Sequence, residues 1–329
     1  MGDISLTLAM WDYDRTRALA DGRVKPDGIA LTCLSLPVEE TFFRMARHRE
    51  FEVAEMSLSS YLLTLNRPEP PFIAIPVFPS RFFRHSCIYL HEGSGIKSPK
   101  DLIGKKVGTP EYQMTAPVWI RGILEDEYGV PADSVSYFTG GEESPGRTEK
   151  LKLDLPPNIH VTPIGPGKTL ARMLAEGEID ALYTARAPST FAPGGPVKRL
   201  FPDFAAVERA YFQKTGIFPI MHVVVIRRDI YRAHPWVAGS LYKAFCRAQA
   251  ITYDDLHETA ALKAMLPWLM AHLADTEALM GRDYWSYGLA GNENTLSTFA
   301  RYSHAQGLAA KRHPPADLFA PETLESFVI

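Results

Sequence analysis

The chain has 329 residues, more than a single hydrophobic core usually supports, so we expect two lobes. Hydrophobic residues make up 46% and charged residues 22% of the sequence, as in an ordinary soluble globular protein. The net charge of −3 gives no electrostatic reason to expect nucleic acid or an anionic membrane as a partner. No stretch of about 18 apolar residues predicts a membrane-spanning helix.

The N-terminus and the cysteines bear on location and cofactors. The first residues run directly into an apolar segment, 4–10, without the basic and long apolar regions of a signal peptide. This predicts a cytoplasmic location. Cys33, Cys87 and Cys246 are odd in number and far apart, which argues against a disulfide framework and a zinc site. We expect no cofactor, but the sequence leaves open a divalent metal held by distant His and carboxylate side chains.

The first 90 residues alternate short apolar runs with amphipathic stretches. This alternation predicts a mostly parallel sheet covered by helices. The segment 66–71 must be a loop, because it holds three prolines within four residues. In chain order we expect strands over 4–10, 51–56, 73–77 and 86–90, with helices over 37–48 and from Ser57 to Leu63.

A second unit of the same kind begins near His91. From Pro235 onward the pattern is helical to the end of the chain. In order we expect a helix over 116–128, strands over 135–138 and 159–164, a helix over 167–176, and strands over 181–184 and 222–226.

Two segments resemble type II solute-binding proteins. Ser98 to Gly108 is similar to the stretch that opens their second lobe, and Gly177 to Ala181 is similar to their second-lobe strand before the hinge. The resemblance implies a two-lobed α/β type II periplasmic-binding-protein-like fold with a central cleft. It also implies two crossover strands, near 86–90 and 222–226. Lobe 1 would then comprise 1–88 and 224–329, and lobe 2 would comprise 89–223.

A narrower resemblance covers nearly the whole chain. Five segments resemble the 4,5-dihydroxyphthalate decarboxylase family: Asp12–Thr16, Ala54–Tyr61, Gly140–Arg147, Ala185–Ser189 and Tyr302–Leu308. The resemblance implies a carboxy-lyase that converts 4,5-dihydroxyphthalate, or a closely related hydroxylated aromatic acid, to 3,4-dihydroxybenzoate and CO2. It also implies a homo-oligomer. Tyr284, Trp285, Tyr287 and the C-terminal helices would form either a subunit interface or core.

Other functions stay open at this point. A non-catalytic binding protein for an aromatic carboxylate would use the same fold, but a transport receptor needs a signal peptide. A different lyase or hydrolase acting on a related aromatic acid would have a similar arginine-rich pocket. Lobe closure around the ligand is expected in each case.

The implied reaction sets three requirements for a site. Each carboxylate of the substrate is para to a hydroxyl, so the ring carbon that bears the leaving carboxylate becomes basic by electron donation from that oxygen. The site must bind or deprotonate the hydroxyl, deliver a proton to the ring carbon, and hold the remaining carboxylate. The phenol itself stores the charge, so the chemistry needs no electron-sink cofactor.

Arginines on loops at expected strand ends suit the carboxylates, because the planar guanidinium binds a carboxylate in a bidentate way. A solvated surface charge is the alternative for each, and Arg84 and Arg186 are the stronger candidates. The candidate arginines are Arg15, Arg81, Arg84, Arg147 and Arg186.

Helix N-termini offer further anion contacts. Ser57 and Ser59 lie at one expected helix start, and Tyr112 and Thr115 lie at another. Helix capping is the alternative, and for Ser57 it suffices. Two other residues, Asp12 and Tyr13, follow the first strand and are candidates for contact with the ring hydroxyls. Trp119, one turn into a helix, lines the pocket or belongs to the core.

Glu55, His85 and His222 are the acid–base candidates. Glu55 ends an apolar strand, where a buried carboxylate is either functional or the structural partner of an arginine. His222 opens one crossover strand and His85 precedes the other. A structural role is the alternative for both. We predict that His222 is the proton donor and that Glu55 is the base or the orienting group.

Overall fold

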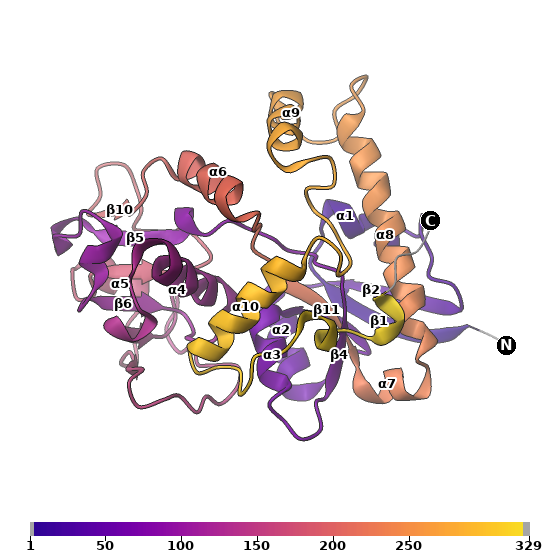
Figure 1. Cartoon of the computed structure of the whole chain (residues 1–329), viewed down its shortest axis with the longest axis horizontal. Helices are drawn as coiled ribbons and strands as arrows, with labels where there is room; N and C mark the ends of the chain where they lie inside the picture. Colours follow the sequence, from indigo (N-terminus) through magenta and orange to yellow (C-terminus); the bar gives the residue numbers. More distant parts are fainter. Residues whose placement is uncertain (1–2, 325–329) are drawn as a thin grey trace.

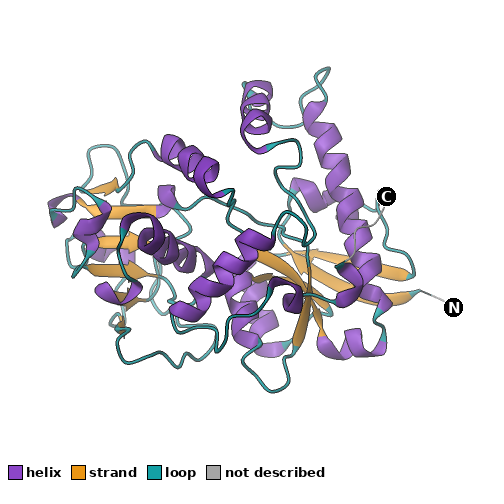
Figure 2. Cartoon of the chain, viewed as in Figure 1, coloured by secondary structure: helices purple, strands orange, loops and turns teal. Residues whose placement is uncertain are grey.

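Two separate β-sheets organise the chain, and each is covered by helices (Figures 1 and 2). The computed structural model describes residues 3–324. The first sheet has the order β2-β1-β3-β11-β4, and the second has the order β10-β5-β9-β6-β7-β8. The strands are β1 (Ile4–Met10), β2 (Ile29–Ser35), β3 (Val53–Ser57), β4 (Phe72–Ile75), β5 (Ile88–His91), β6 (Lys106–Thr109), β7 (Ser136–Thr139), β8 (Val161–Pro163), β9 (Ala181–Tyr183), β10 (Val197–Arg199) and β11 (His222–Arg227).

Helices occupy much of the remaining chain. The α-helices are α1 (Asp14–Ala20), α2 (Val38–His48), α3 (Leu58–Thr64), α4 (Thr115–Tyr128), α5 (Leu170–Ala175), α6 (Phe204–Thr215), α7 (Arg228–Ala233), α8 (Trp236–His257), α9 (Leu269–Met280) and α10 (Glu293–Ala305). The short 3-10 helices are η1 (His85–Cys87), η2 (Glu92–Ser94), η3 (Pro99–Leu102), η4 (Ala132–Ser134), η5 (Pro315–Leu318) and η6 (Pro321–Thr323). The helical pattern expected from Pro235 to the end of the chain is found as α8, α9 and α10, but after Ala305 the described residues hold only two short 3-10 helices.

The antiparallel strand β11 joins two parts of the first sheet. Strands β1, β2 and β3 are parallel to one another, whereas β11 runs antiparallel to both β3 and β4. The start of β11 therefore lies at the same edge of the sheet as the end of β3, with His222 opposite Ser57. All five residues of β3 are buried, as expected for a central strand with both faces covered.

The chain passes between the sheets in the two segments that precede β5 and β11. The strands expected to cross, 86–90 and 222–226, each belong to one sheet: β5 pairs in the second and β11 in the first. The segments 76–87 and 216–221 make the passage, and an isolated antiparallel bridge between Arg81 and Ile220 pairs them.

Helix α4, which follows β6 of the second sheet, also packs against α3 and α10. Figure 1 shows α10 between the two lobes. Trp119 of α4 is buried, donates from Nε1 to the carbonyl of Ile220 (2.8 Å) and lies against Phe299 and Tyr302 of α10. Of the two roles considered for Trp119, the structure therefore shows the core. The two lobes share this packed layer behind the cleft.

In the aromatic cluster near residue 285, Tyr287 is buried, whereas Tyr284 and Trp285 are half-buried. Trp285 donates from Nε1 to the carbonyl of Phe78 (2.9 Å), and Tyr287 is 9% exposed. Large exposed apolar side chains gather instead on the segment that joins α8 to α9. Across residues 3–324, none of the helices is long and apolar enough to cross a membrane.

Candidate active site

A cavity of about 400 Å³ lies where the two sheets face each other. Its walls come from the ends of β1 and β3, the start of β11, the start of α4 and the loops after β7 and β9. Carboxyl ends of parallel strands are the usual place for a ligand in α/β proteins. The lining residues are Trp11, Tyr13, Pro37, Val38, Glu39, Phe42, Ser57, Ser80, Arg84, Met114, Thr115, Ala116, Arg147, Lys150, Ala185, Arg186, Met221 and His222.

Glu55 lies behind the first-lobe wall and connects three groups. Its carboxylate has no exposed surface. Oε1 lies 2.6 Å from Nδ1 of His222 and accepts a hydrogen bond of 2.6 Å from the hydroxyl of Tyr13. Oε2 accepts from the backbone N–H of Trp11 at 3.1 Å. The buried carboxylate is therefore satisfied by neutral donors and an imidazole, without an arginine.

The contact with Glu55 fixes the orientation of His222. With Nδ1 engaged by the carboxylate, Nε2 is the ring nitrogen left for the cavity. The side chain of His222 is 16% exposed, and the ring of Phe42 meets it edge-on with centroids 4.8 Å apart. Burial and Glu55 raise the pKa of Tyr13 well above its usual range, so Tyr13 stays a hydrogen-bond donor to Glu55.

Arg84 is buried, and within residues 3–324 its guanidinium forms no hydrogen bond or ion pair with a carboxylate, although Glu208 interacts with it electrostatically. Its Nε contacts the sulfur of Met221 at 3.1 Å, and Nη1 lies 3.6 Å from the sulfur of Cys87 and 3.5 Å from the carbonyl of Ala185. Burial lowers the pKa of Arg84, and Cys87 and Glu208 offset this only in part. A buried guanidinium with such weak partners is suited to bind an anion from the cavity.

Two further cations, Arg147 and Lys150, line the same cavity. Arg147 donates from Nε and Nη2 to Oε1 of Glu111 (2.9 and 2.7 Å), and Lys150 forms an ion pair with the same oxygen. Burial alone would raise the pKa of Glu111, but Lys150 and Arg147 outweigh it and hold it below the usual value. Glu149 is a second acidic group beside Lys150, so the cluster holds two cations and two acids, of which Arg147 and Lys150 line the cavity.

Arg186 bridges the two lobes at the rim. Its guanidinium pairs with Glu39 of α2 at 2.8 Å, and the side chain is 67% exposed. Both residues also line an adjoining cavity of about 570 Å³ that extends along the loop 141–148. Because this pair is solvent-exposed, it contributes little to stability and can open without a large energetic cost.

A hydroxyl pair joins the lobes at the floor of the cavity. Ser57 at the end of β3 and Thr115 at the start of α4 have their side-chain oxygens 2.7 Å apart. Thr115 also accepts from the backbone N–H of Ser59 (3.1 Å), and Ser57 caps α3 through the N–H of Ser60 (3.4 Å). Capping explains only part of the role of Ser57, since its hydroxyl also reaches the cavity.

Comparison with known proteins identifies the family. No family model matches the chain. A 4,5-dihydroxyphthalate decarboxylase from Comamonas testosteroni is 43% identical over 330 aligned residues, which cover all of both chains. The chain belongs to the 4,5-dihydroxyphthalate decarboxylase family. A second member, from Pseudomonas putida, is 45% identical over 204 residues, 62% of this chain and 79% of that relative. The family expected from the sequence motifs is thereby confirmed.

Solved structures agree on the fold. The periplasmic aliphatic sulphonate binding protein SsuA from Escherichia coli superposes with a TM-score of 0.54 at 13% identity, covering 98% of this chain and 99% of that one. The alkanesulfonate-binding protein SsuA from Xanthomonas axonopodis pv. citri gives 0.52 at 12% identity, covering 97% and 99%. The expected periplasmic-binding-protein-like fold is therefore confirmed for this member of the decarboxylase family.

Several residues singled out from the sequence lie outside the cavity. Asp12 is exposed and pairs with Arg17 at 3.0 Å. The guanidinium of Arg81 is turned inward to the carbonyls of Ser286 (2.6 Å) and Phe218 (3.2 Å). The side chains of Asp12 and Arg81 therefore do not line the cavity. The position of a residue near the end of a strand does not show in the sequence which way its side chain points.

Other candidate site residues from the sequence also do not line the cavity, and most of them are buried. The hydroxyl of Tyr112 donates to the carbonyl of Gln306 (3.1 Å), and Ser59 is fully buried. His85 is also buried, with its ring 5.4 Å from that of Phe201 and 5.2 Å from that of Tyr211. Arg15 lines a different pocket, behind Tyr13. These residues contact the protein interior, not the cavity described here.

Sequence reasoning missed part of the wall. Trp11 and Phe42 supply apolar surface, and Lys150 supplies a buried charge. Trp11 directly follows β1, so its place beside Asp12 and Tyr13 was a usable signal. Lys150 lies in a stretch without periodicity, and nothing in the sequence links it to Glu111.

The described residues do not suggest a metal centre. No group of three or more His, Cys, Asp and Glu side chains between residues 3 and 324 is arranged to hold a metal ion. We therefore assign no metal ligand.

Proposed function

We propose that the chain is a carboxy-lyase that converts 4,5-dihydroxyphthalate, or a closely related hydroxylated phthalate, to 3,4-dihydroxybenzoate and CO2. Full-length similarity to a decarboxylase of that name supports the substrate class. The observation that carries the proposal is the position of His222. Its Nδ1 is engaged by buried Glu55, which leaves Nε2 for the substrate, and His222 lines a cavity that Arg84, Arg147 and Lys150 also line.

The proton donor in this proposal is His222. The imidazolium delivers a proton from Nε2 to the ring carbon that bears the leaving carboxylate, while the para hydroxyl donates electron density into the ring. The bond from the ring to the carboxylate then breaks, its electron pair restores aromaticity, and CO2 leaves. Solvent returns the proton to His222, so the net reaction consumes one proton for each CO2. Glu55 keeps the imidazole oriented.

Arg84 and the Arg147–Lys150 pair hold the two carboxylates of the substrate. Arg84, Arg147 and Lys150 all line one cavity, and each brings a cationic group to it. This arrangement favours a dianion over a monoanion. The product has lost one carboxylate, so it binds more weakly than the substrate and is released.

Hydroxyl groups of the protein complete the site. Ser57, Thr115 and Ser80 line the cavity and suit the ring hydroxyls as hydrogen-bond partners. The rings of Phe42 and Trp11 supply apolar walls for the aromatic ring. No step in this scheme requires a cofactor or a metal ion, because the substrate's own hydroxyl stabilises the developing charge.

Turnover by metal-stripped protein tests the proposal. Purified protein is treated with chelator, mixed with 4,5-dihydroxyphthalate and assayed for 3,4-dihydroxybenzoate and CO2. We expect turnover without added metal. Activity that returned only with a divalent ion would keep the reaction and overturn the cofactor-free scheme. Tight binding without turnover would overturn the reaction and leave a binding protein.

We also propose that the enzyme self-associates through the segment that joins α8 to α9 together with the first two residues of α9, here called the arm and defined as residues 258–270. Figure 1 shows this part of the chain projecting from the body. Exposed apolar patches of this kind mark interaction surfaces. Replacing Met265 and Trp268 together with Ser, followed by light scattering, should shift the mass toward the monomer. The large exposed side chains of the arm are Leu262, Met265, Leu266, Trp268 and Met270.

A cytoplasmic location stays a prediction, which cell fractionation would test.

A further inference from the structure

Arg15 is inserted between two aromatic rings behind the proposed active site. Its guanidinium carbon lies 4.2 Å from the ring centroid of Tyr13 and 4.2 Å from that of Trp285. Nε donates to the carbonyl of Pro79 (2.7 Å), and Nη1 pairs with Asp14 at 3.0 Å. The side chain is 16% exposed. These contacts fix the guanidinium in one orientation.

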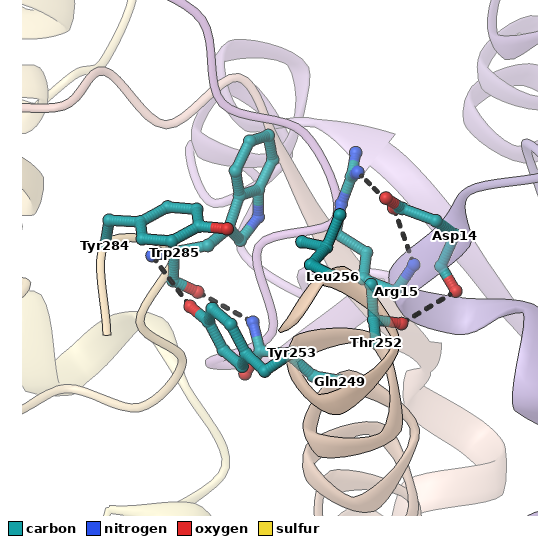
Figure 3. A pocket seen from close by; sticks show the side chains of 8 residues that line it. All are labelled: Asp14, Arg15, Gln249, Thr252, Tyr253, Leu256, Tyr284 and Trp285. Carbon is teal, nitrogen blue, oxygen red and sulfur yellow. Dashed lines mark hydrogen bonds and ion pairs between the residues drawn. The ribbon is translucent and has the colours of Figure 1, made fainter. Parts of the chain in front are cut away.

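The far side of this stack is a small pocket, not the substrate cavity. Figure 3 shows Arg15 with Asp14 and Trp285 among the residues that line this pocket. The pocket has a volume of about 140 Å³ and shares no lining residue with the cavity that contains His222. Arg15 does not line the larger cavity, whereas Tyr13 does. Tyr13 therefore stands between Arg15 and the site of the proposed reaction.

The other partner of Arg15 is itself firmly held. Trp285 donates to the carbonyl of Phe78 (2.9 Å), and its ring meets that of Phe218 edge-on at 5.4 Å. Phe78 and Pro79 belong to the segment 76–87 that passes between the lobes. The stack of Trp285, Arg15 and Tyr13 is thus anchored at one end to this segment and ends, through the hydroxyl of Tyr13, at Glu55.

We infer that Arg15 is a positioning residue for the proposed reaction, which acts through Tyr13 to hold Glu55 and His222 in place. The inference rests on the proposed function. Tyr13 and His222 share Oε1 of Glu55, so a displaced Tyr13 hydroxyl would allow the carboxylate to rotate and the imidazole to follow. A shift of about 1 Å in a catalytic group is enough to reduce a rate by 10²-fold.

A double-mutant cycle in kcat separates this role from a general structural one. The enzymes are wild type, Arg15→Met, Tyr13→Phe and the double variant. We expect Arg15→Met to lower kcat about tenfold and to leave KM within about twofold. Tyr13→Phe should lower kcat at least as much, and the double variant should be no slower than Tyr13→Phe, because Arg15 acts through the missing hydroxyl.

Further variants keep the test decisive. Arg23→Met removes an exposed arginine that pairs with Asp21 (2.8 Å) near the same helix and should retain the wild-type kcat. If Arg15→Met unfolds, Trp285→Phe keeps a ring beside Arg15, and its effect on kcat should also vanish in the Tyr13→Phe background.

Three outcomes would overturn the inference. Multiplicative losses in the double variant would mean that Arg15 and Tyr13 act independently. A raised KM with an unchanged kcat for Arg15→Met would mean that Arg15 contacts the substrate. An unchanged kcat in Arg15→Met would mean that the stack is dispensable. A wild-type protein without turnover would instead overturn the proposed function.

Discussion

Nδ1 of His222 lies 2.6 Å from Oε1 of Glu55, although 167 residues separate them in the chain. The pairing of β11 with β3 brings them together, because His222 is opposite Ser57 and Glu55 is opposite Val224 in the antiparallel register. The two side chains are diagonal neighbours across the strands. The contact is therefore built into the sheet and does not depend on a mobile loop.

Glu55→Gln should lower kcat by about 10²- to 10⁴-fold, the usual effect of disabling acid–base catalysis. The carboxylate of Glu55 contacts the hydroxyl of Tyr13, the backbone N–H of Trp11 and the imidazole of His222. A glutamine amide places N–H groups where one carboxylate oxygen was, so it cannot accept hydrogen bonds from all of these groups. Steady-state kinetics measure the loss. Glu50→Gln is the matched control, since Glu50 is exposed and pairs with Arg44. A near-wild-type kcat for Glu55→Gln would contradict the orienting role.

Arg84→Met should weaken binding of phthalate, a dianion without ring hydroxyls, by roughly 10- to 100-fold. One charge-assisted hydrogen-bonded contact contributes about 1.5 to 3 kcal/mol. Stability of the free protein should be unchanged or higher, because the variant removes a buried charge whose interaction with Glu208 offsets the cost of burial only in part. Calorimetric titration and thermal unfolding measure the two effects.

Arg186→Met is the control variant for Arg84→Met. Arg186 is largely exposed and paired with Glu39, so its loss should weaken phthalate binding less than fivefold, in line with about 1 kcal/mol or less for exposed pairs. Larger losses at Arg186 than at Arg84 would mean that the rim, not the buried wall, holds the carboxylate.

His85 should make the folded state sensitive to acid. Burial lowers the pKa of His85 from 6.5 to about 4, and neither ring nitrogen has a hydrogen-bond partner in the described chain. The unfolded state therefore takes up the proton first, so stability that is complete above pH 6.5 is lost as the pH falls toward 4. The loss is about 1.4 kcal/mol per pH unit.

His85→Phe should remove this contribution. Denaturant unfolding at pH 6.5 and 4.5 should show the wild type losing roughly 2 to 3 kcal/mol more than the variant over that interval. Phenylalanine suits the site, because Phe201 and Tyr211 already surround the ring. Equal losses in the two proteins would show that His85 is not buried in its neutral form.

Gly122→Ala should destabilise the protein by about 1 to 3 kcal/mol through overpacking. A Cβ at Gly122 would lie 2.2 Å from Cδ2 of Tyr302, in the layer where α4 meets α10. Helix propensity alone predicts the opposite sign. Gly239→Ala in α8 is the control: nothing lies within 4 Å of its Cβ position, so it should stabilise the protein by about 0.5 to 1 kcal/mol. Thermal unfolding of both variants checks the prediction.

The sequence predicted helices and strands best where apolar residues recur at a regular spacing. The helix expected over 37–48 is α2, with Phe42, Met45 and Ala46 buried as the spacing requires. The apolar run expected over 51–56 is the buried strand β3, displaced by one or two residues. Edge strand β2 was not anticipated, because apolar residues stand on both of its faces: Ile29, Leu31 and Cys33 face inward, but Ala30 and Leu34 are exposed.

Chain length indicated two lobes. Local sequence indicated most of the elements and the choice of Glu55 and His222 as candidates, since each depends on a run of neighbouring residues. Only the tertiary structure decided which candidates meet. Arg15 and Arg84 look alike in the sequence, as arginines near strand ends. One is stacked between Tyr13 and Trp285, and the other faces the cavity without a carboxylate. The direction of a long, flexible side chain depends on partners that lie far away in the chain, and local periodicity carries no information about them.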